Sequence, residues 1–334
     1  MDTLSDDCLL HILAHVDEGI TAFSLGATSH QNRACVRHLW SKGEFQPTID
    51  PNTGDRSEPK RFFRVVRPGD DMQAALDRCP TGAAVLLLPG VYGTGATLTL
   101  RTDITVFGRG LATIQVNTSE VEGGPAGPFN MPIIESLAEN ASLCGISAHV
   151  NQVDGGEVEY VPNTMFNLIS AKGGALRVQA CTFDEDGCGG IYVAGGHTTL
   201  VDCKFNVTDS TVRVTKSGRA TIKACELTCE PDYENICATG PDSEVECTGS
   251  TVFHGAVCVR DHAKATLVGN TISAPLTMMD ANFAASIVSN NTMGGHLVLV
   301  SNTKKAWPRV RGMATNAFSA GFRIQHKSMK TYVV

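Results

Sequence analysis

The sequence predicts a mainly β protein in which short strands stack into a parallel solenoid. Three phrases of one pattern, "ALRVQACTF", "TTLVDCKF" and "ATIKACEL", place Cys181, Cys203 and Cys225 at intervals of 22 residues. A second family of short alternating strands interleaves with them, such as "GGIYV" at 189–193 and "STVRV" at 210–214. The 334 residues include 33 glycines and few aromatics, as expected for strands separated by tight turns. A repeat of about 19–24 residues is typical of stacked solenoids.

Residues 1–42 differ from the rest because they show helical periodicity. Leu9, Ile12, Leu13 and Val16 occupy positions i, i+3, i+4 and i+7 and so form one apolar helical face. Ser5 is a suitable N-cap for this helix. The phrases "ITAFSLGA" and "NRACVRHLW" predict two further short amphipathic helices. Three helices this small do not bury a sufficient core alone, so they need a partner.

The pattern of these helices resembles the F-box, a module that binds Skp-family adaptors of SCF-type cullin-RING ubiquitin ligases. The usual proline of that pattern is Ser5 here, and its Val-Ser-x-x-Trp element is reduced to "TSHQNR". The resemblance implies that residues 1–42 form an F-box-like module with an adaptor-binding surface. The alternative is a helical cap docked on the solenoid. The residues that match the pattern, and would face the adaptor, are Leu4, Leu9, Ile12, Leu13, Val16, Leu25, Leu39 and Trp40.

Residues 43–62 are rich in proline, glycine and charge and are interpreted as a linker. The solenoid is expected to follow over residues 63–302. It begins with a strand and a short helix in which Met72, Ala75 and Leu76 are apolar, and "LLLPGVY" opens the first coil. This beginning resembles right-handed parallel β-helices of the pectate-lyase-like (pectin-lyase-like) superfamily, where a small helix covers the open end. The later coils resemble carbohydrate-binding and sugar-hydrolase (CASH) repeats, which implies about ten coils of roughly 22 residues.

The regularly spaced cysteines predict a ladder of side chains inside the solenoid. Equivalent positions of successive coils lie about 4.8 Å apart, so Cys181, Cys203 and Cys225 would stack as buried thiols. Asn270 and Asn291 reach the same point later, where stacked amides hydrogen-bond along the axis. Cys247 comes 22 residues after Cys225, but its flanking residues are out of phase, so its place stays open. A zinc site formed by Cys225, Cys229, Cys237 and Cys247 is the alternative, but these four cysteines lack the close CxxC pairs of structural zinc sites, so no metal is expected.

Acidic residues gather in one family of turns and form the candidate target-facing surface. If these turns stack, their carboxylates would bind a cation or a sugar; the alternative is a solvated loop face. Arg213 and Arg260 follow the second strand family, together with Lys216, Asp261 and His262, and are scattered in phase. The motifs of polygalacturonases and the "W-x-D-H" element of pectate lyases are missing, so no catalytic residue is assigned. The acidic residues assigned to this surface are Asp184, Asp186, Asp209, Asp232 and Glu234.

The C-terminal segment, residues 303–334, carries seven lysines and arginines and no acidic residue. Its aromatic residues Trp307, Phe318 and Phe322 favour a role as a cover for the last coil. The alternative is a basic arm that contacts an acidic partner. In either case the segment is expected to follow the repeats directly.

The composition restricts the class of partner. A formal charge of −7 argues against a general nucleic-acid binder. The acidic start, "MDTLSDDCLL", has no basic region typical of a secretory signal, and no apolar run reaches the roughly 20 residues that span a bilayer. We therefore expect a protein of the cytoplasm or nucleus, with its twelve cysteines as thiols, no cofactor and no membrane partner.

Together the two resemblances imply a substrate receptor of an SCF-type ubiquitin ligase. In this hypothesis, residues 1–42 bind a Skp-family adaptor and through it a cullin, belonging to the same cell or to a host. The solenoid binds an unidentified protein or glycoprotein target, and the chain itself is not an enzyme. Two alternatives stay open: a polysaccharide lyase or hydrolase, and a structural solenoid without catalytic function, for example in a virus.

Overall fold

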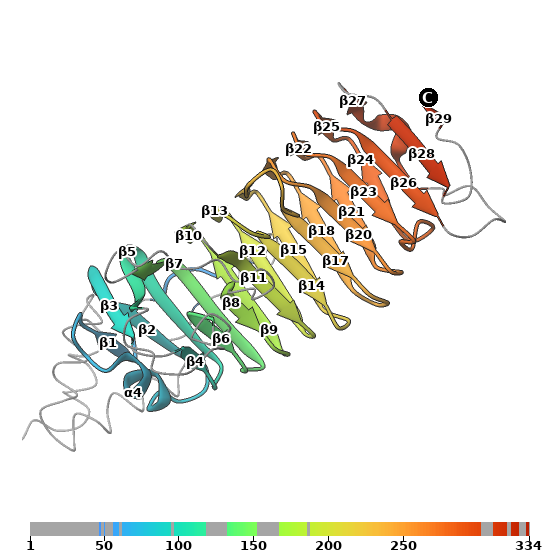
Figure 1. The fold of residues 1–334 in the computed structure, drawn as a ribbon. Helices are drawn as coiled ribbons and strands as arrows, with labels where there is room; N and C mark the ends of the chain where they lie inside the picture. The colour runs from blue at the N-terminus through green and yellow to red at the C-terminus, as the bar shows by residue number, and fades with distance from the viewer. Residues whose placement is uncertain are drawn as a thin grey trace, which may run out of the picture.

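The structure, a computed structural model, forms a right-handed parallel β-solenoid of about nine turns. The coils stack into one elongated body, which confirms the predicted solenoid (Figure 1). The predicted helices of residues 1–42 lie outside the part of the chain that the structure describes. The described residues are 47, 50, 56–59, 62–94, 97–117, 132–151, 167–185, 188–301, 310–318, 322–326 and 332–333.

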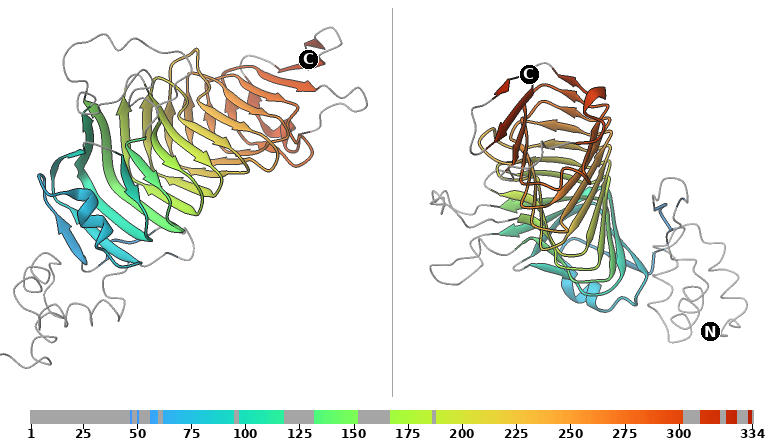
Figure 2. Two further views of the ribbon diagram at one scale, coloured as in Figure 1. Left: turned by 60° about the horizontal axis from the view of Figure 1, so that its bottom comes forward. Right: turned by 90° about the vertical axis from the view of Figure 1, so that its right-hand side faces the viewer.

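Strands of successive coils form two sheets that wrap around one interior (Figure 2). Sheet 1 contains β1 (Arg64–Val66), β2 (Ala83–Leu87), β3 (Gly90–Thr94), β5 (Ile104–Asn117), β7 (Asn140–Asn151), β9 (Ala175–Gln179), β10 (Thr182–Glu185), β12 (His197–Val201), β13 (Lys204–Val207), β15 (Arg219–Lys223), β16 (Glu226–Thr228), β18 (Glu244–Thr248), β19 (Thr251–Phe253), β21 (Lys264–Val268), β22 (Thr271–Ile272), β24 (Ile287–Ser289), β25 (Thr292–Met293) and β27 (Ala317–Phe318). Sheet 2 contains β4 (Leu98–Leu100), β6 (Ile134–Ser136), β8 (Asn167–Ala171), β11 (Gly189–Ala194), β14 (Val212–Thr215), β17 (Ile236–Thr239), β20 (Val257–Arg260), β23 (Leu276–Met279), β26 (Leu297–Ser301), β28 (Phe322–His326) and β29 (Tyr332–Val333).

Each middle coil contributes one strand to sheet 2 and two strands to sheet 1, which meet at a sharp corner. The corner residue has a positive φ: 50° at Ala180, 53° at Asp202 and 52° at Ala224. A side chain in this left-handed region costs roughly 1–2 kcal/mol, so the corner is a strained position that the stacking must stabilise. Later coils place residues better suited to this backbone at the same corner, Gly249, Gly269 and Asn290.

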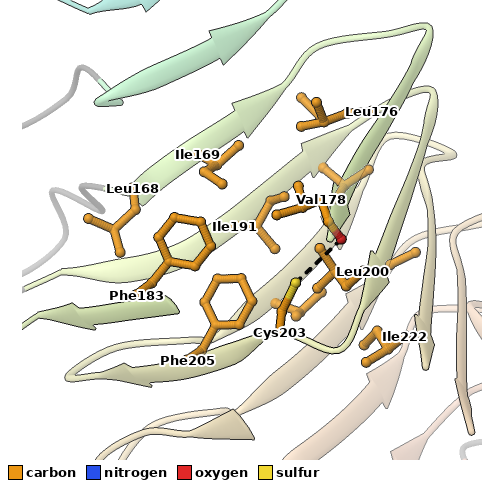
Figure 3. Close-up of a cluster of buried hydrophobic side chains, with 14 of the residues drawn as sticks. Leu168, Ile169, Leu176, Val178, Phe183, Ile191, Leu200, Cys203, Phe205 and Ile222 are labelled. Atoms are coloured by element: carbon orange, nitrogen blue, oxygen red, sulfur yellow. Dashed lines mark hydrogen bonds between the residues drawn. The ribbon is translucent and has the colours of Figure 1, made fainter. Parts of the chain in front are cut away.

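The interior is filled by columns of like side chains, because the pairing register brings equivalent residues of neighbouring coils together. Val178, Leu200 and Ile222 form one such column from β9, β12 and β15. In the column of β10 and β13, the rings of Phe183 and Phe205 stack with centroids 4.7 Å apart and planes at 27° (Figure 3). A side chain that fits one coil therefore packs against its own counterpart in the next.

A ladder of polar side chains follows the corners, as predicted from the spacing. Cys181, Cys203 and Cys225 are buried there, and the Cys203 thiol donates to the carbonyl oxygens of Val178 and Val201, both at 3.3 Å (Figure 3). Each next coil supplies an acceptor for a corner N–H. The backbone N–H of Cys203 donates to Cys225 Sγ (3.4 Å), and the backbone N–H of Cys225 donates to Ser250 Oγ (3.1 Å). From Ser250 onward the acceptor is the side-chain oxygen of an asparagine. Ser250 N–H donates to Asn270 Oδ1 (2.9 Å), Asn270 N–H to Asn291 Oδ1 (2.9 Å), and Asn291 N–H to Asn316 Oδ1 (3.0 Å).

The ladder settles the open position of Cys247. Ser250 occupies the corner position of that coil, while Cys247 lies in β18 opposite Ile222 and faces the interior from a different column. Among the described residues, no group of three or more His, Cys, Asp or Glu side chains is arranged to hold a metal ion. All ten described cysteines are buried free thiols.

The first coil is closed by the short helix α4 (Met72–Asp77), where Met72, Ala75 and Leu76 are buried as expected. The side-chain amide of Gln73 makes the two hydrogen bonds with β4 that a neighbouring strand would otherwise make. Its Oε1 accepts from the Thr99 N–H (2.7 Å), and its Nε2 donates to the Thr99 carbonyl (3.0 Å). The amide thus satisfies backbone groups at the open edge of sheet 2.

The described part of the segment before β1 covers the outer face of the first coils. Phe62 is buried against Ala84, Leu86, Phe107 and Cys144. Arg56 donates to Thr105 Oγ1 at 2.8 Å, and Glu58 pairs with Arg109 at 2.5 Å. Arg56, Glu58 and Phe62 therefore contact the solenoid, although they fall within the predicted linker of 43–62.

The stacking continues beyond residue 302 into the basic C-terminal segment. Strand β27 pairs in parallel with β25, and β28 pairs in parallel with β26. Strand β29 then pairs with β28 in the antiparallel direction, so it lies at the last edge of sheet 2. Trp307 lies outside the described residues. Among the described residues, no helix has the length and apolar character that crossing a membrane requires.

Candidate functional site

The outer face of sheet 2 carries a row of side chains that pair across consecutive coils. Strands alternate inward and outward residues, so the pairing register aligns Tyr192, Arg213, Cys237, Cys258 and Thr277 in one outward column. The residue two positions later forms a second outward column, with Thr215, Thr239, Arg260 and Met279. The two columns bring polar and ionisable groups of β11, β14, β17, β20 and β23 to one surface.

An irregular loop between β16 and β17 adds a carboxylate to this surface. The loop is fixed by Asn235, whose fully buried amide donates to the carbonyl oxygens of Leu227 (3.0 Å), Phe253 (2.8 Å) and His254 (3.2 Å). The neighbouring residue Glu234 is half-buried and reaches over the two columns. Because Asn235 ties the loop to two neighbouring coils, the Glu234 carboxylate has a defined place.

Glu234 lies between two arginines of the outward columns. Its Oε2 is 3.0 Å from Arg260 Nη2 and 3.9 Å from Arg213 Nη2. Arg260 also donates through Nε to Thr239 Oγ1 (3.2 Å) and through Nη2 to Cys237 Sγ (3.5 Å). The Cys237 sulfur is 3.4 Å from Thr239 Oγ1. We refer to Arg213, Glu234, Cys237, Thr239, Cys258 and Arg260 together as the Glu234 cluster.

The thiols of the cluster have unequal acidities. The neighbouring Cys258 thiol, as a hydrogen-bond donor, lowers the pKa of Cys237, while burial opposes this effect. The same interaction, together with burial, raises the pKa of Cys258. The first proton is therefore lost from Cys237, and its sulfur faces the guanidinium of Arg260. One carboxylate oxygen of Glu234, Oε2, is thus shared by the two arginines.

The acidic turns predicted from the sequence are only partly brought together. Asp184 is exposed on β10, and its Oδ1 accepts from the Asn206 amide at 2.7 Å. The register pairs Asp184 of β10 with Asn206 of β13. The next coil therefore places an amide, and not a second carboxylate, beside Asp184. Asp209 accepts from the N–H of Ser210 at 2.6 Å. Asp232 is exposed in the loop before β17, and Asp186 lies outside the described residues.

Two of these turns do converge on one buried thiol. Burial, followed by the negative charges of Asp209 and Glu230, raises the pKa of Cys229 to about 12. The backbone N–H of Glu230 donates to the Thr208 carbonyl at 3.2 Å, which brings the two turns together. The predicted acidic surface is thus divided, because Glu234 belongs to the arginine cluster on sheet 2 and Asp184 lies on sheet 1.

The eight residues that match the F-box pattern all lie outside the described part of the chain, so their role stays a prediction. They are Leu4, Leu9, Ile12, Leu13, Val16, Leu25, Leu39 and Trp40.

The sequence indicated that Arg213 and Arg260 are scattered in phase, and the register does place them in different columns, two residues apart. The sequence did not reveal that both face outward from sheet 2 and that Glu234 joins them. The signal was present in the phrases "STVRV", "ENICA" and "GAVCV", whose alternation marks Arg213, Cys237 and Cys258 as outward positions. Asp261 and His262 do lie in an exposed turn, as the sequence indicated.

Comparison with protein-family models finds no match to this chain, and comparison with curated proteins finds none either.

Proposed function

We propose that this chain is a non-catalytic recognition subunit whose solenoid binds a protein target. The observation that supports this most is the outer face of sheet 2, where charged and polar side chains are aligned across consecutive coils. Ten parallel strands spaced by about 4.8 Å give a face roughly 45 Å long. Strands of four residues make it about 13 Å wide, so the face offers roughly 600 Å², close to the ~800 Å² per partner of standard interfaces.

The rigidity of this face also favours binding. Glu234, Arg213 and Arg260 are held by contacts with one another and with Thr239 and Ser210. Side chains that are ordered before binding lose less conformational entropy in a complex. Such a face suits a partner with complementary charge and hydrogen-bonding groups.

The finer form of the proposal is that the chain is the substrate receptor of an SCF-type ubiquitin ligase. Its support is the helical pattern of residues 1–42, in which the eight residues named above match the F-box. In this form the N-terminal module binds a Skp-family adaptor, the adaptor binds a cullin, and sheet 2 selects the protein that is ubiquitinated.

The experiment that tests the receptor hypothesis measures direct binding of purified full-length chain to a purified Skp-family adaptor. Leu9→Asp combined with Ile12→Asp should abolish binding, because two charges would enter an apolar interface. Phe253→Ser, on the exposed surface of β19, is the matched control and should bind normally. An adaptor that does not bind the unmodified chain contradicts the receptor hypothesis and leaves target recognition by sheet 2 to be tested separately.

A polysaccharide lyase or hydrolase is the second candidate function. It is favoured by the position of Glu234 beside two arginines on an outer face, since elimination needs a base and neutralisation of a uronate charge. Incubation with uronate polymers and neutral glycans tests it. Cleavage that is lost in Glu234→Gln but retained in Asp232→Asn would replace the recognition proposal.

A further inference from the structure

Two thiols of the Glu234 cluster lie next to each other on adjacent coils. Cys237 on β17 and Cys258 on β20 are direct partners in the parallel register, and both follow an inward valine or isoleucine, so they share the outer face. In-register neighbours of a parallel pair lie about 4.8 Å apart, within the range of about 4.4–6.8 Å between Cα atoms that a disulfide spans. The two sulfurs therefore sit where a covalent bond between coils can form.

In the part of the chain that the structure describes, side chains contact the Cys237 thiol. Cys237 is 1% exposed and Cys258 is 6% exposed, although both point away from the interior. Cys237 contacts Arg260 through Nη2 and Thr239 through Oγ1, and it also interacts with the side chains of Cys258 and Glu234. The side chain of Arg260 is itself 35% exposed and that of Glu234 26%. Rotation of a half-exposed arginine is sufficient to admit a small reagent from solvent.

The same chain contains stacked thiols in a different environment. In the interior ladder, the Cys203 thiol donates to two carbonyl oxygens, and Cys225 donates to the Lys223 carbonyl at 3.2 Å. Hydrogen bonding with Cys181 raises the pKa of Cys203, and hydrogen bonding with Cys203 raises that of Cys225. Both sets of thiols therefore lie close to one another. They differ in their neighbours, because Cys237 contacts the Arg260 guanidinium whereas Cys203 and Cys225 donate to backbone carbonyl oxygens.

We propose that Cys237 and Cys258 are a modification site at which a peroxide-class oxidant forms a reversible disulfide between β17 and β20. The Cys237 thiolate attacks one peroxide oxygen, the O–O bond breaks, and a sulfenic acid and one water form. The Cys258 sulfur then attacks the sulfenic sulfur and displaces its oxygen as a second water. Two thiols are oxidised by two electrons, one peroxide is reduced, and both thiol protons leave in water.

The Cys258 and Thr239 hydrogen bonds lower the pKa of Cys237 against the opposing effects of burial and Glu234, and the adjacent Arg260 guanidinium also favours Cys237 as the attacking sulfur. A thiolate, and not a thiol, is the nucleophile, and a neighbouring cation favours the thiolate. Arg260 Nη2 lies 3.5 Å from the sulfur, and the Thr239 hydroxyl at 3.4 Å is able to donate to it. Cys258, the hydrogen-bond donor to that sulfur, is in place as the resolving thiol.

The disulfide would also change the outer face of sheet 2. Once bonded to Cys258, the Cys237 sulfur no longer carries charge, so Arg260 loses one of its partners and retains Glu234 and Thr239. Neighbouring parallel strands hold Cβ atoms further apart than the ~3.8 Å typical of a disulfide, so the bond is strained and easily reduced. The inference is independent of the adaptor hypothesis.

The test treats the full-length, reduced chain with hydrogen peroxide under native conditions, blocks the remaining thiols, and maps peptides without reduction. The expected first product is a Cys237–Cys258 cross-linked peptide that dithiothreitol removes. Cys258→Ser should lose the cross-link completely while Cys237 becomes trapped as a sulfenic acid that dimedone labels. A first cross-link within Cys181, Cys203 and Cys225, or over-oxidation of Cys237 in the unmodified chain without any cross-link, would overturn the proposal.

A second pair of variants tests the part played by the cation. Arg260→Gln should slow cross-linking by about three- to tenfold, because a smaller fraction of Cys237 is thiolate. Arg260→Lys keeps the charge and should retain most of the rate. Equal rates in both variants and in the unmodified chain would contradict the assignment of Arg260, and circular dichroism of each variant confirms that the fold is intact.

Discussion

At the scale of single residues, the corner ladder resolves a conflict between backbone shape and hydrogen bonding. A residue with positive φ turns the chain out of the parallel ladder, so the N–H that follows it lacks a strand partner. This N–H donates to a side chain of the next coil: the acceptor is first a cysteine sulfur, then the Ser250 hydroxyl, and finally an asparagine carbonyl oxygen. A buried N–H without a partner costs about 1–3 kcal/mol, so the ladder stabilises each corner by a comparable amount.

Asn291 is hydrogen-bonded in both directions along this ladder, to Asn270 and to Asn316. Its Oδ1 accepts from the N–H and the amide of Asn270 at 2.9 and 3.0 Å, and its Nδ2 donates to the Leu267 carbonyl at 2.8 Å. We expect Asn291→Leu to lower the free energy of unfolding by about 3 kcal/mol, because these groups stay buried without partners. Urea unfolding measures the loss. Asn206→Ala, which removes only an exposed bond to Asp184, should change stability by less than about 0.5 kcal/mol.

Cys203 tests whether the interior tolerates charge. Cys203→Asp would place a carboxylate against the carbonyl oxygens of Val178 and Val201, so we expect a loss of several kcal/mol and unfolding of the middle coils. Cys203→Ser should fold, because Ser250 occupies the equivalent position in a later coil. Thermal unfolding compares the two. Rapid labelling of Cys181, Cys203 and Cys225 in the native chain would contradict their burial.

At the scale of elements, the sequence was sufficient to predict the stacked coils, because similar side chains recur at equivalent positions of successive coils. It left the place of Cys247 open because the repeat is not constant: successive ladder residues are 22, 25, 20 and 21 positions apart from Cys203 to Asn291. The longer loop between β16 and β17 absorbs the difference. That same loop supplies Glu234, and its conformation depends on buried contacts of Asn235 that no periodic pattern encodes.

The composition of the segment before β1 did not predict that this segment packs on the solenoid. Its proline and charge indicated a linker, yet Phe62 is 3% exposed and packs edge-on against Phe107, with centroids 5.4 Å apart and planes at 72°. Alternation explains why a cover is needed: the outward residues Ala84, Leu86 and Phe107 of β2 and β5 are apolar. A solvent-facing strand of this composition otherwise exposes an apolar patch.

Removing this cover should be detectable at a thiol. We expect Phe62→Ala to destabilise the fold by about 3 kcal/mol and to make Cys144 reactive toward a thiol reagent, because Cys144 belongs to the cluster beneath Phe62. Burial raises the pKa of Cys144 to about 11, so its labelling is slow in the unmodified chain. Phe253→Ala, at an exposed position, is the control. If labelling of Cys144 is unchanged in Phe62→Ala, the segment does not protect it.

At the scale of the whole molecule, the buried thiols make stability depend on pH. Burial is the main cause that raises the pKa of Cys79 and Cys144 from 9.0 to about 11, and that of Cys247 to about 12. Above about pH 9 the unfolded chain loses these protons while the native chain keeps them, so the unfolded state gains stability. The contribution is complete below pH 9 and is lost as pH rises toward 11–12.

We therefore expect the free energy of unfolding to fall between about pH 9 and pH 11, by up to about 1.4 kcal/mol per pH unit for each such thiol. Urea unfolding at several pH values measures the slope. Cys247→Ala lowers overall stability but should make the slope shallower, because one of the contributing protons is removed. A slope that Cys247→Ala leaves unchanged would show that other groups cause the alkaline loss.

The last prediction separates the N-terminal residues from the solenoid. The described coils have their own core from Val66 onward, the helix α4 at the first coil and the cover from Arg56 to Phe62. Deleting residues 1–45 should therefore leave a cooperatively folded solenoid, with a melting temperature within a few degrees of the full chain, while abolishing binding to a Skp-family adaptor. Deleting residues 1–62 removes Phe62 as well and should cost about 3 kcal/mol. If residues 1–42 instead cap the solenoid, the shorter deletion should already aggregate or melt early. The two deletions thus distinguish an adaptor-binding module from a structural cap, and calorimetry together with an adaptor pull-down decides between them.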